Sequence, residues 1–195
     1  MAWAPPAPLL LAFLLFPALA LATPRSEAKI DEYPDRYDEE FRKWTKRYFG
    51  PGFDWRWFKA QAVVESKLKP RAVGGGARGI MQILPSTYAK LRRENPGFGQ
   101  IDDPRWNIAA GIYYNRQNYE LWDDRIAEPE TLSFTLASYN AGPGRIEQAF
   151  NKTQKGGKDA SRWTIVEHHA PRLTRRYVRH IHDLMGSKLH SPGER

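Results

Sequence analysis

Apolar and aromatic side chains recur at helical spacing along most of this chain. Two stripes at i, i+4 and i+7 show the pattern: Tyr37, Phe41, Trp44 and Tyr48, and Tyr177, Ile181 and Leu184. This spacing predicts amphipathic helices that each bury one face. Because no segment shows convincing strand alternation, the sequence predicts an all-α, single-domain fold without internal repeats.

Proline, glycine and capping residues divide this pattern into separate helices. The expected helix starts are Asp54 for a helix over residues 54–68, Pro85, Asp103-Pro104 and Glu128-Pro129. Gly142-Pro143-Gly144 should end the fourth of these helices and begin the next. The polar residues 151–162 predict a surface loop before the last helix.

Glu65 occupies an unusual position in this pattern. It follows Phe58 and Ala62 at i+7 and i+3, so it should project from the buried face of its helix. Pro70 and the glycines at 74–76 predict a helix end shortly afterwards, near the negative pole of the helix dipole. Burial and this potential both raise the pKa of a carboxyl group, as an acid catalyst requires. A solvated glutamate at a helix end is the alternative.

Residues 1–22 have the pattern of a secretory signal peptide. The apolar run LLLAFLLFPALALA covers residues 9–22 and is followed by TPRSE. Roughly 14 residues are too few to span a bilayer, and Pro17 interrupts them. We therefore expect export to the periplasm or the medium, and no membrane span after cleavage. Residues 1–8 lack Lys and Arg, so an uncleaved anchor is the alternative.

Cysteine and histidine usage restricts the chemistry of the chain. It has no cysteine, which excludes disulfides and a lipid-modified cysteine. Five histidines, with only His168 and His169 adjacent, show no metal-ligand spacing, so neither a metal nor a cofactor is expected. About 170 residues after processing are enough to bury one core.

The chain is basic, with a net charge of +8 and a pI near 9.7. Its basic residues are spread over several segments, for example Arg42, Lys46, Arg92, Arg175 and Arg179. Export would also separate the protein from cellular nucleic acid, so an anionic surface of the cell envelope is the expected partner.

Three motifs resemble the lytic transglycosylase (SLT) family of lysozyme-like fold. The first contains Glu65-Ser66 and residues 76–83, GARGIMQI; the second is residues 137–144, ASYNAGPG; the third is residues 174–178, TRRYV. The resemblance covers roughly residues 50–186. With it, the expected organisation is a signal peptide (1–22), an N-terminal helical segment (23–49), the SLT-like domain (50–186) and a flexible tail (187–195).

The resemblance implies cleavage of the β-1,4 bond between N-acetylmuramic acid and N-acetylglucosamine in peptidoglycan. Glu65 would protonate the glycosidic oxygen and then, as a base, assist the muramic O6 hydroxyl in closing a 1,6-anhydro ring. Tyr177 would hold Glu65. The expected substrate-binding residues are Ser66, Met81, Gln82, Tyr139, Asn140 and Tyr177. Core packing is the alternative for Met81 and Tyr177, and helix-end structure for Ser66.

Two other functions stay open at this stage. A muramidase similar to goose-type lysozyme would need a second carboxylate, for which Asp102 or Asp103 is nearest in sequence. A wall-binding module could keep the fold without catalysis. A monomer is expected, and small members of the family are often recruited by an envelope or secretion machine.

Two positions depart from the family pattern. Gly74-Gly75-Gly76 replaces a slightly longer loop that usually contains a serine, and Leu173 replaces a glutamate at the start of the third motif. Both changes should affect substrate positioning more than the reaction.

Overall fold

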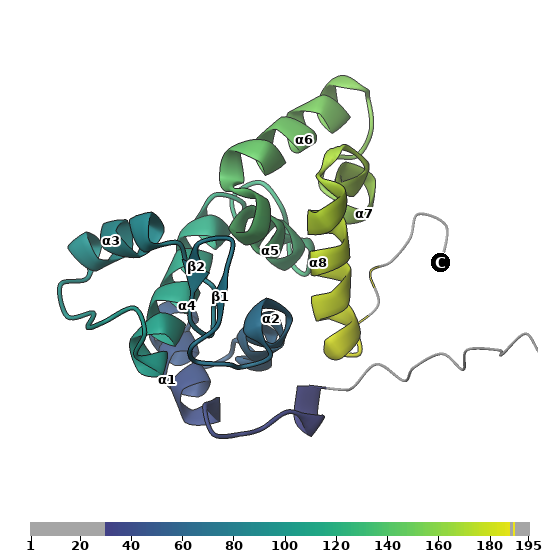
Figure 1. The fold of residues 1–195 in the computed structure, drawn as a ribbon. Helices are drawn as coiled ribbons and strands as arrows, with labels where there is room; N and C mark the ends of the chain where they lie inside the picture. Colours follow the sequence, from purple (N-terminus) through teal and green to yellow (C-terminus); the bar gives the residue numbers. More distant parts are fainter. Residues whose placement is uncertain (1–29, 188, 190–195) are drawn as a thin grey trace, which may run out of the picture.

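The computed structural model describes residues 30–187 and residue 189. This part of the chain forms eight α-helices and one two-stranded hairpin, which lies at the surface (Figure 1). The elements are η1 (Ile30–Glu32), α1 (Asp38–Phe49), α2 (Arg56–Ser66), β1 (Val73–Gly74), β2 (Ala77–Arg78), α3 (Pro85–Glu94), α4 (Pro104–Glu120), α5 (Glu130–Ala141), α6 (Pro143–Lys155), α7 (Trp163–Val166), η2 (Glu167–His169) and α8 (Arg172–Leu184). The predicted signal peptide and most of the predicted tail lie outside the described residues.

Helices α4 and α5 pack against each other at the centre of the molecule. Helices α1 and α3 pack on α4, whereas α6 and α8 pack on α5, and α2 contacts both α1 and α8 (Figure 1). One hydrophobic cluster runs through these contacts, from Phe41 on α1 to Leu184 on α8. The predicted stripe on the last helix is confirmed, because Tyr177, Ile181 and Leu184 are all buried.

Most of the predicted helix starts are confirmed by local hydrogen bonds or prolines. Pro85 and Pro143 are the first residues of α3 and α6, and Asp103 caps α4 by accepting the amide of Arg105 at 2.9 Å. Asp54 likewise accepts the amide of Arg56 at 3.0 Å, although α2 itself begins at Arg56.

Helix α2 ends earlier than predicted. The backbone turns left-handed at Lys67 and Leu68, with φ of 55° and 59°, before Pro70 or the glycines are reached. Leu68 is buried by this turn. The helix therefore ends where Leu68 packs into the core and not at a helix-breaking residue. Glu65 consequently lies in the last turn of α2.

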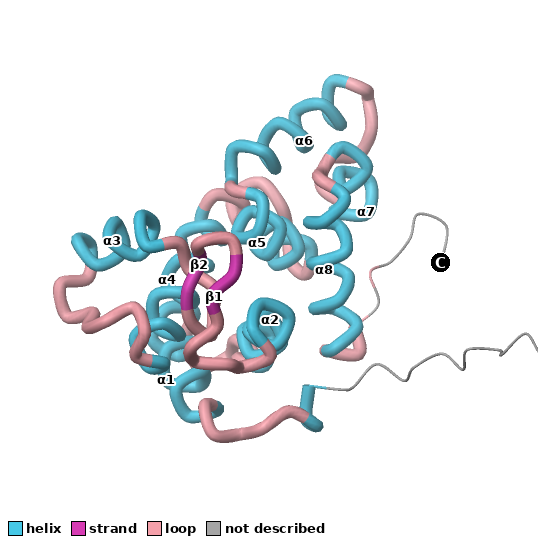
Figure 2. Tube along the Cα trace, in the orientation of Figure 1, coloured by secondary structure: helices cyan, strands magenta, loops and turns pink. Residues whose placement is uncertain are grey.

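The glycine-rich segment forms a hairpin, so the prediction of a chain without strands is wrong there. Val73 pairs with Arg78 and Gly74 with Ala77, and Figure 2 shows these strands against an otherwise helical chain. Gly75 and Gly76 have positive φ angles of 57° and 84°, as a two-residue hairpin turn requires. Strands of two residues are too short to produce an alternating pattern. The all-α class itself is confirmed.

The predicted loop over residues 151–162 is wrong in its first part. Helix α6 continues to Lys155, and the buried Thr153 donates its hydroxyl to the carbonyl of Ala149 at 2.9 Å. Thr153 continues the buried face of Ile146, Ala149 and Phe150. The residues next to it in the sequence are polar, so composition alone suggested a loop.

Candidate active site

Glu65 lies in the last turn of α2, facing α8. The Tyr177 hydroxyl donates a hydrogen bond of 2.6 Å to Oε1 of Glu65. Tyr177 is buried on α8, whereas Glu65 keeps partial access to solvent. The structure thus brings together two of the predicted site residues from distant motifs.

The pKa of Glu65 is raised by its surroundings. Burial raises it and the hydrogen bond from Tyr177 lowers it by a smaller amount, so that the pKa shifts from 4.5 to about 7. A carboxyl group with this pKa populates both its protonated and its ionised form near neutral pH. Glu65 can therefore donate a proton in one step and accept one in the next.

Two surface pockets that share Asn140 are lined by residues close to Glu65. The first, of about 630 Å³, is lined by residues that include Val64, Leu173 and Tyr177. The second, of about 290 Å³, is lined by residues that include Gln82 and Tyr139. Asn140 lines both and accepts the Thr174 hydroxyl at 2.8 Å. We refer to these two pockets together as the groove beside Glu65, because Tyr177 of the first donates a hydrogen bond to Glu65 and Tyr139 of the second is affected by the charge of Glu65.

Tyr139 forms the inner wall of the second pocket. Its hydroxyl donates to the backbone carbonyl of Met81 at 2.8 Å, and its ring lies 5.2 Å from that of Tyr114. Burial, followed by the charge of Glu65 and by Tyr114, raises the pKa of Tyr139 well above its usual value. Tyr139 is thus a neutral, fixed wall close to Glu65.

Gln82 lines the same pocket and braces the hairpin. Its side-chain nitrogen donates to the carbonyls of Ala72 at 3.0 Å and Gly79 at 2.8 Å. The backbone of Gln82 is left-handed, with φ of 48°, which is uncommon for a residue with a side chain. Strain of this kind is often kept where a side chain must point into a site.

Ser66 and Met81 are both buried, which favours the structural alternative for each. The Ser66 hydroxyl donates to the carbonyl of Ile80 at 2.7 Å and so joins the end of α2 to the first motif. The side chain of Met81 packs against Gly111 on α4, so closely that a Cβ atom there would lie 2.7 Å from it. Ser66 and Met81 thus hold the first motif against α2 and α4.

Three buried amides that support the site were missed by sequence reasoning. Asn107 accepts the Met81 amide at 2.7 Å and donates to the carbonyls of Arg78 and Ile101. Asn115 donates to Gln61 at 2.6 Å. Burial and the neighbouring Glu65 raise the pKa of Tyr177 well above its usual value, and Gln61 opposes a small part of that rise. Gln61 precedes Glu65 by four residues, so the helical spacing could have revealed it.

The two carboxylates considered for a hydrolytic mechanism have other partners. Asp102 forms an ion pair with Arg78 on β2, in which Arg78 Nε lies 2.9 Å from Oδ1. Asp103 caps α4. The pKa shift of Glu65 has burial and Tyr177 as its causes, without a contribution from either aspartate.

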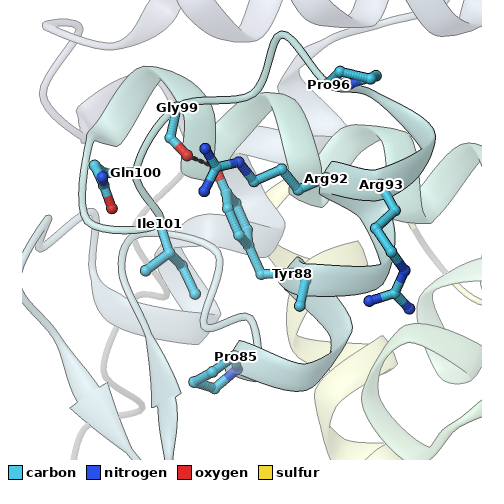
Figure 3. A pocket seen from close by; sticks show the side chains of 9 residues that line it. Pro85, Tyr88, Arg92, Arg93, Pro96, Gly99, Gln100 and Ile101 are labelled. Carbon is cyan, nitrogen blue, oxygen red and sulfur yellow. Dashed lines mark hydrogen bonds between the residues drawn. The ribbon is translucent and has the colours of Figure 1, made fainter.

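A further pocket, of about 570 Å³, lies between α3 and the loop that leads to α4 (Figure 3). There the Tyr88 hydroxyl donates to the carbonyl of Gly99 at 3.2 Å, and Arg92 and Arg93 stand at the rim. The lining contains no carboxyl group, so it offers no proton donor comparable to Glu65.

Membrane spans and metal-binding clusters are both absent from the described residues. None of the helices there is long and apolar enough to cross a membrane. No cluster of three or more His, Asp or Glu side chains within residues 30–187 could hold a metal ion.

The helical layers and the carboxyl group at the end of α2 define a lysozyme-like domain. The chain belongs to the transglycosylase SLT family, because the model of the Transglycosylase SLT domain matches residues 41–161. The predicted family is thereby confirmed; the matched residues contain the first two motifs, whereas the third, residues 174–178, lies beyond them.

Relatives in sequence and in structure agree with this assignment. The chain is 34% identical over 125 residues to "Membrane-bound lytic murein transglycosylase F" of Alcanivorax borkumensis, covering 64% of this chain and 26% of that protein. The protein of the same name from Marinobacter nauticus is 33% identical over 142 residues, covering 72% and 27%. The 70 kDa soluble lytic transglycosylase Slt70 of Escherichia coli superposes with a TM-score of 0.63 at 27% identity, over 80% of this chain and 25% of that one. The chain thus spans about a quarter of these relatives.

Proposed function

We propose that this protein is a peptidoglycan lytic transglycosylase that uses Glu65 as its single acid and base. The observation that carries the proposal is the hydrogen bond between the buried Tyr177 and the partly buried Glu65, whose carboxyl group has a pKa of about 7. The family and the names of the relatives support peptidoglycan as the substrate.

In the first step, protonated Glu65 gives its proton to the oxygen between N-acetylmuramic acid and N-acetylglucosamine. The bond from C1 of the muramic residue to that oxygen breaks, and N-acetylglucosamine leaves with a free hydroxyl. In the second step, the muramic O6 bonds to C1 and passes its proton to ionised Glu65. The product is a 1,6-anhydro sugar, and Glu65 is protonated again.

An internal hydroxyl suits a site with one carboxyl group. Ordinary glycoside hydrolysis uses a second carboxylate to attack or to activate water. A hydroxyl held against the reacting carbon has a large effective concentration and does not need that second group. The engagement of Asp102 with Arg78, and of Asp103 with the start of α4, supports this mechanism over a muramidase.

The groove beside Glu65 has the surface expected for a sugar polymer. Gln82 offers its side-chain oxygen, since its nitrogen is bonded to Ala72 and Gly79, and Asn140 offers its nitrogen, since its oxygen accepts from Thr174. Leu84 and Leu173 are exposed apolar residues in the linings of the two pockets. Amides can bond acetamido and hydroxyl groups, and apolar side chains can cover the sugar faces. Leu173, which departs from the family pattern, would contribute an apolar contact where a glutamate is usual.

The proposed setting is the cell envelope outside the cytoplasm, where peptidoglycan lies. The protein would reach it by the predicted signal peptide and act as a monomer. Recruitment by an envelope or secretion machine also belongs to this proposal.

Digestion of purified sacculi tests the reaction. Wild-type protein, Glu65→Gln and the control Glu39→Gln would be compared, with products identified by mass spectrometry. Glu39 is an exposed residue on α1, away from the groove. We expect anhydro-muropeptides from the wild type and the control, and a rate lower by about 10²- to 10⁴-fold from Glu65→Gln.

The other outcomes distinguish the alternatives. Reducing-end muropeptides would identify a muramidase and refute the transglycosylase proposal. Binding to sacculi without turnover, unchanged by Glu65→Gln, would instead identify a wall-binding module.

A further inference from the structure

A basic pocket of about 400 Å³ lies between α6 and η2. Helix α6 contributes Arg145, Gln148, Ala149 and Lys152, which share one face at i, i+3, i+4 and i+7. His169 of η2 stands on the other side of the pocket, followed by Ala170 and Pro171. Most polar groups of the side chains that line this pocket are therefore donors from two separate elements; the Gln148 amide and one ring nitrogen of neutral His169 could also accept.

The positive charges around this pocket lack acidic partners within the described residues. Arg145 and Lys152 form no ion pair there, because Glu147 on α6 pairs with Arg125 at 2.9 Å and Glu167 on η2 pairs with Arg179 at 3.3 Å. Desolvation and then the charges of Lys152, Lys158 and His168 lower the pKa of His169. The cations thus lie close enough together to affect one another.

The basic pocket adjoins the groove beside Glu65 at Arg145. Arg145 lines both the basic pocket and the pocket that contains Gln82 and Tyr139. The pocket that contains Gln82 and Tyr139 shares Asn140 with the pocket that Tyr177 lines. A polymer that lies along the groove therefore brings its side groups to Arg145 and Lys152.

We propose that Arg145, Lys152 and His169 form a subsite for the free carboxylates of the peptides attached to peptidoglycan strands. This inference rests on the proposed function, since it assigns a second part of the same substrate. The sugar backbone offers mostly neutral hydroxyl and acetamido groups, whereas the attached peptides carry carboxylates. Arg and Lys are suited to bind carboxylates, and a neutral His169 still offers a ring N–H donor.

Steady-state kinetics on two matched substrates test the subsite. One substrate is glycan strands with their peptides, and the other is the same strands after an amidase has removed the peptides. For wild-type protein we expect a lower KM for the peptide-bearing strands, by about threefold for each exposed cation engaged. The advantage should decline as salt is added, because the contacts are exposed.

The variant Lys152→Gln should bring the ratio of the two KM values towards one. A merely structural role for Lys152 would raise both KM values and leave their ratio unchanged. The control Lys46→Gln removes an exposed cation from α1, and it should keep the wild-type ratio. Equal KM values for the wild type, or the same change in both variants, would overturn the proposal.

Direct binding separates this inference from the proposed function. A fluorescent acidic peptide with the carboxylates of a stem peptide, and its fully amidated counterpart, would be titrated with wild-type protein and with Lys152→Gln. Preferential binding of the acidic peptide, weakened in Lys152→Gln, supports the subsite even if no glycan is cleaved. Equal binding of both peptides would refute the subsite even if the lytic activity is demonstrated.

Discussion

The hydroxyl of Tyr177 on α8 donates a hydrogen bond of 2.6 Å to Oε1 of Glu65 on α2, across 112 positions of sequence. Because a donor stabilises the ionised carboxylate, this bond holds the pKa of Glu65 lower than burial alone would. It also fixes the direction in which the carboxyl group points. The same contact therefore affects both the pKa and the orientation of the Glu65 carboxyl group, the proposed catalyst.

Tyr177→Phe should move the pH dependence of catalysis upward. Loss of the hydrogen bond removes the interaction that lowers the pKa of Glu65, so that pKa rises above about 7. The high-pH limb of kcat/KM, where the acid form is lost, should shift by about one pH unit. The control Tyr119→Phe removes a hydroxyl that bonds Glu128 instead, and should leave the profile in place. An unshifted profile in Tyr177→Phe would contradict the coupling.

Glu65→Gln should stabilise the fold above neutral pH. The unfolded carboxyl group ionises near pH 4.5 and the folded one near 7, so the folded state binds more protons between these values. Wild-type stability is thus fully present below about pH 4.5 and falls as the pH rises through 7. Glutamine does not titrate, so the variant should gain up to about 3 kcal/mol over the wild type by pH 8 and little at pH 4. Urea unfolding at the two pH values measures this difference, and a gap independent of pH would disprove it.

Ser66→Ala should lower stability rather than substrate affinity. The buried hydroxyl donates to the carbonyl of Ile80, and its loss leaves that acceptor unpaired, at a cost of about 1–2 kcal/mol. Ser86→Ala, at an exposed position of α3, is the matched control and should cost much less. Thermal unfolding and KM are the measurements. A higher KM with unchanged stability would show that Ser66 binds substrate after all.

Gly79→Ala should be strongly destabilising, and Gly144→Ala should not. Gly79 has φ of 82°, and an added Cβ would lie 2.3 Å from the buried amide of Asn107. Backbone strain together with this clash should cost at least about 3 kcal/mol. Nothing lies within 4 Å of a Cβ added to Gly144 on α6, where alanine should gain about 0.5 kcal/mol. Similar midpoints for the two variants in chemical denaturation would contradict this contrast.

The long helices could be predicted from sequence because their boundaries depend on local chemistry. Pro85, Asp103 and Pro143 act through their own backbone or side chain within one turn, so their effects are visible in the sequence itself. The hairpin at 73–78 and the end of α2 depend instead on what packs around them. Leu68 turns inward because a core exists there, which no local pattern records.

The proposed catalytic pair could be predicted from helical spacing and motif resemblance, whereas the supporting residues required the structure. Glu65 stood out by its spacing, and Tyr177 by its place in the third motif. Ser66 and Met81 also belong to the motifs, yet both are buried, because a motif records residues that shape a site as well as those that touch a ligand. Asn107 and Asn115 lie outside the quoted motifs, and only the hydrogen bonds of the fold reveal their role.

The open turn at Gly75 and Gly76 makes the hairpin a natural place for added sequence. A Cβ atom added to either glycine would have no neighbouring atom within 4 Å, and both glycines are exposed, so extra residues there would project into solvent. The entropic cost of lengthening a surface loop grows slowly with its length. Affinity tags or wall-binding peptides could therefore be inserted at this point, beside the groove, while Gln82 and Asn107 keep the base of the hairpin anchored.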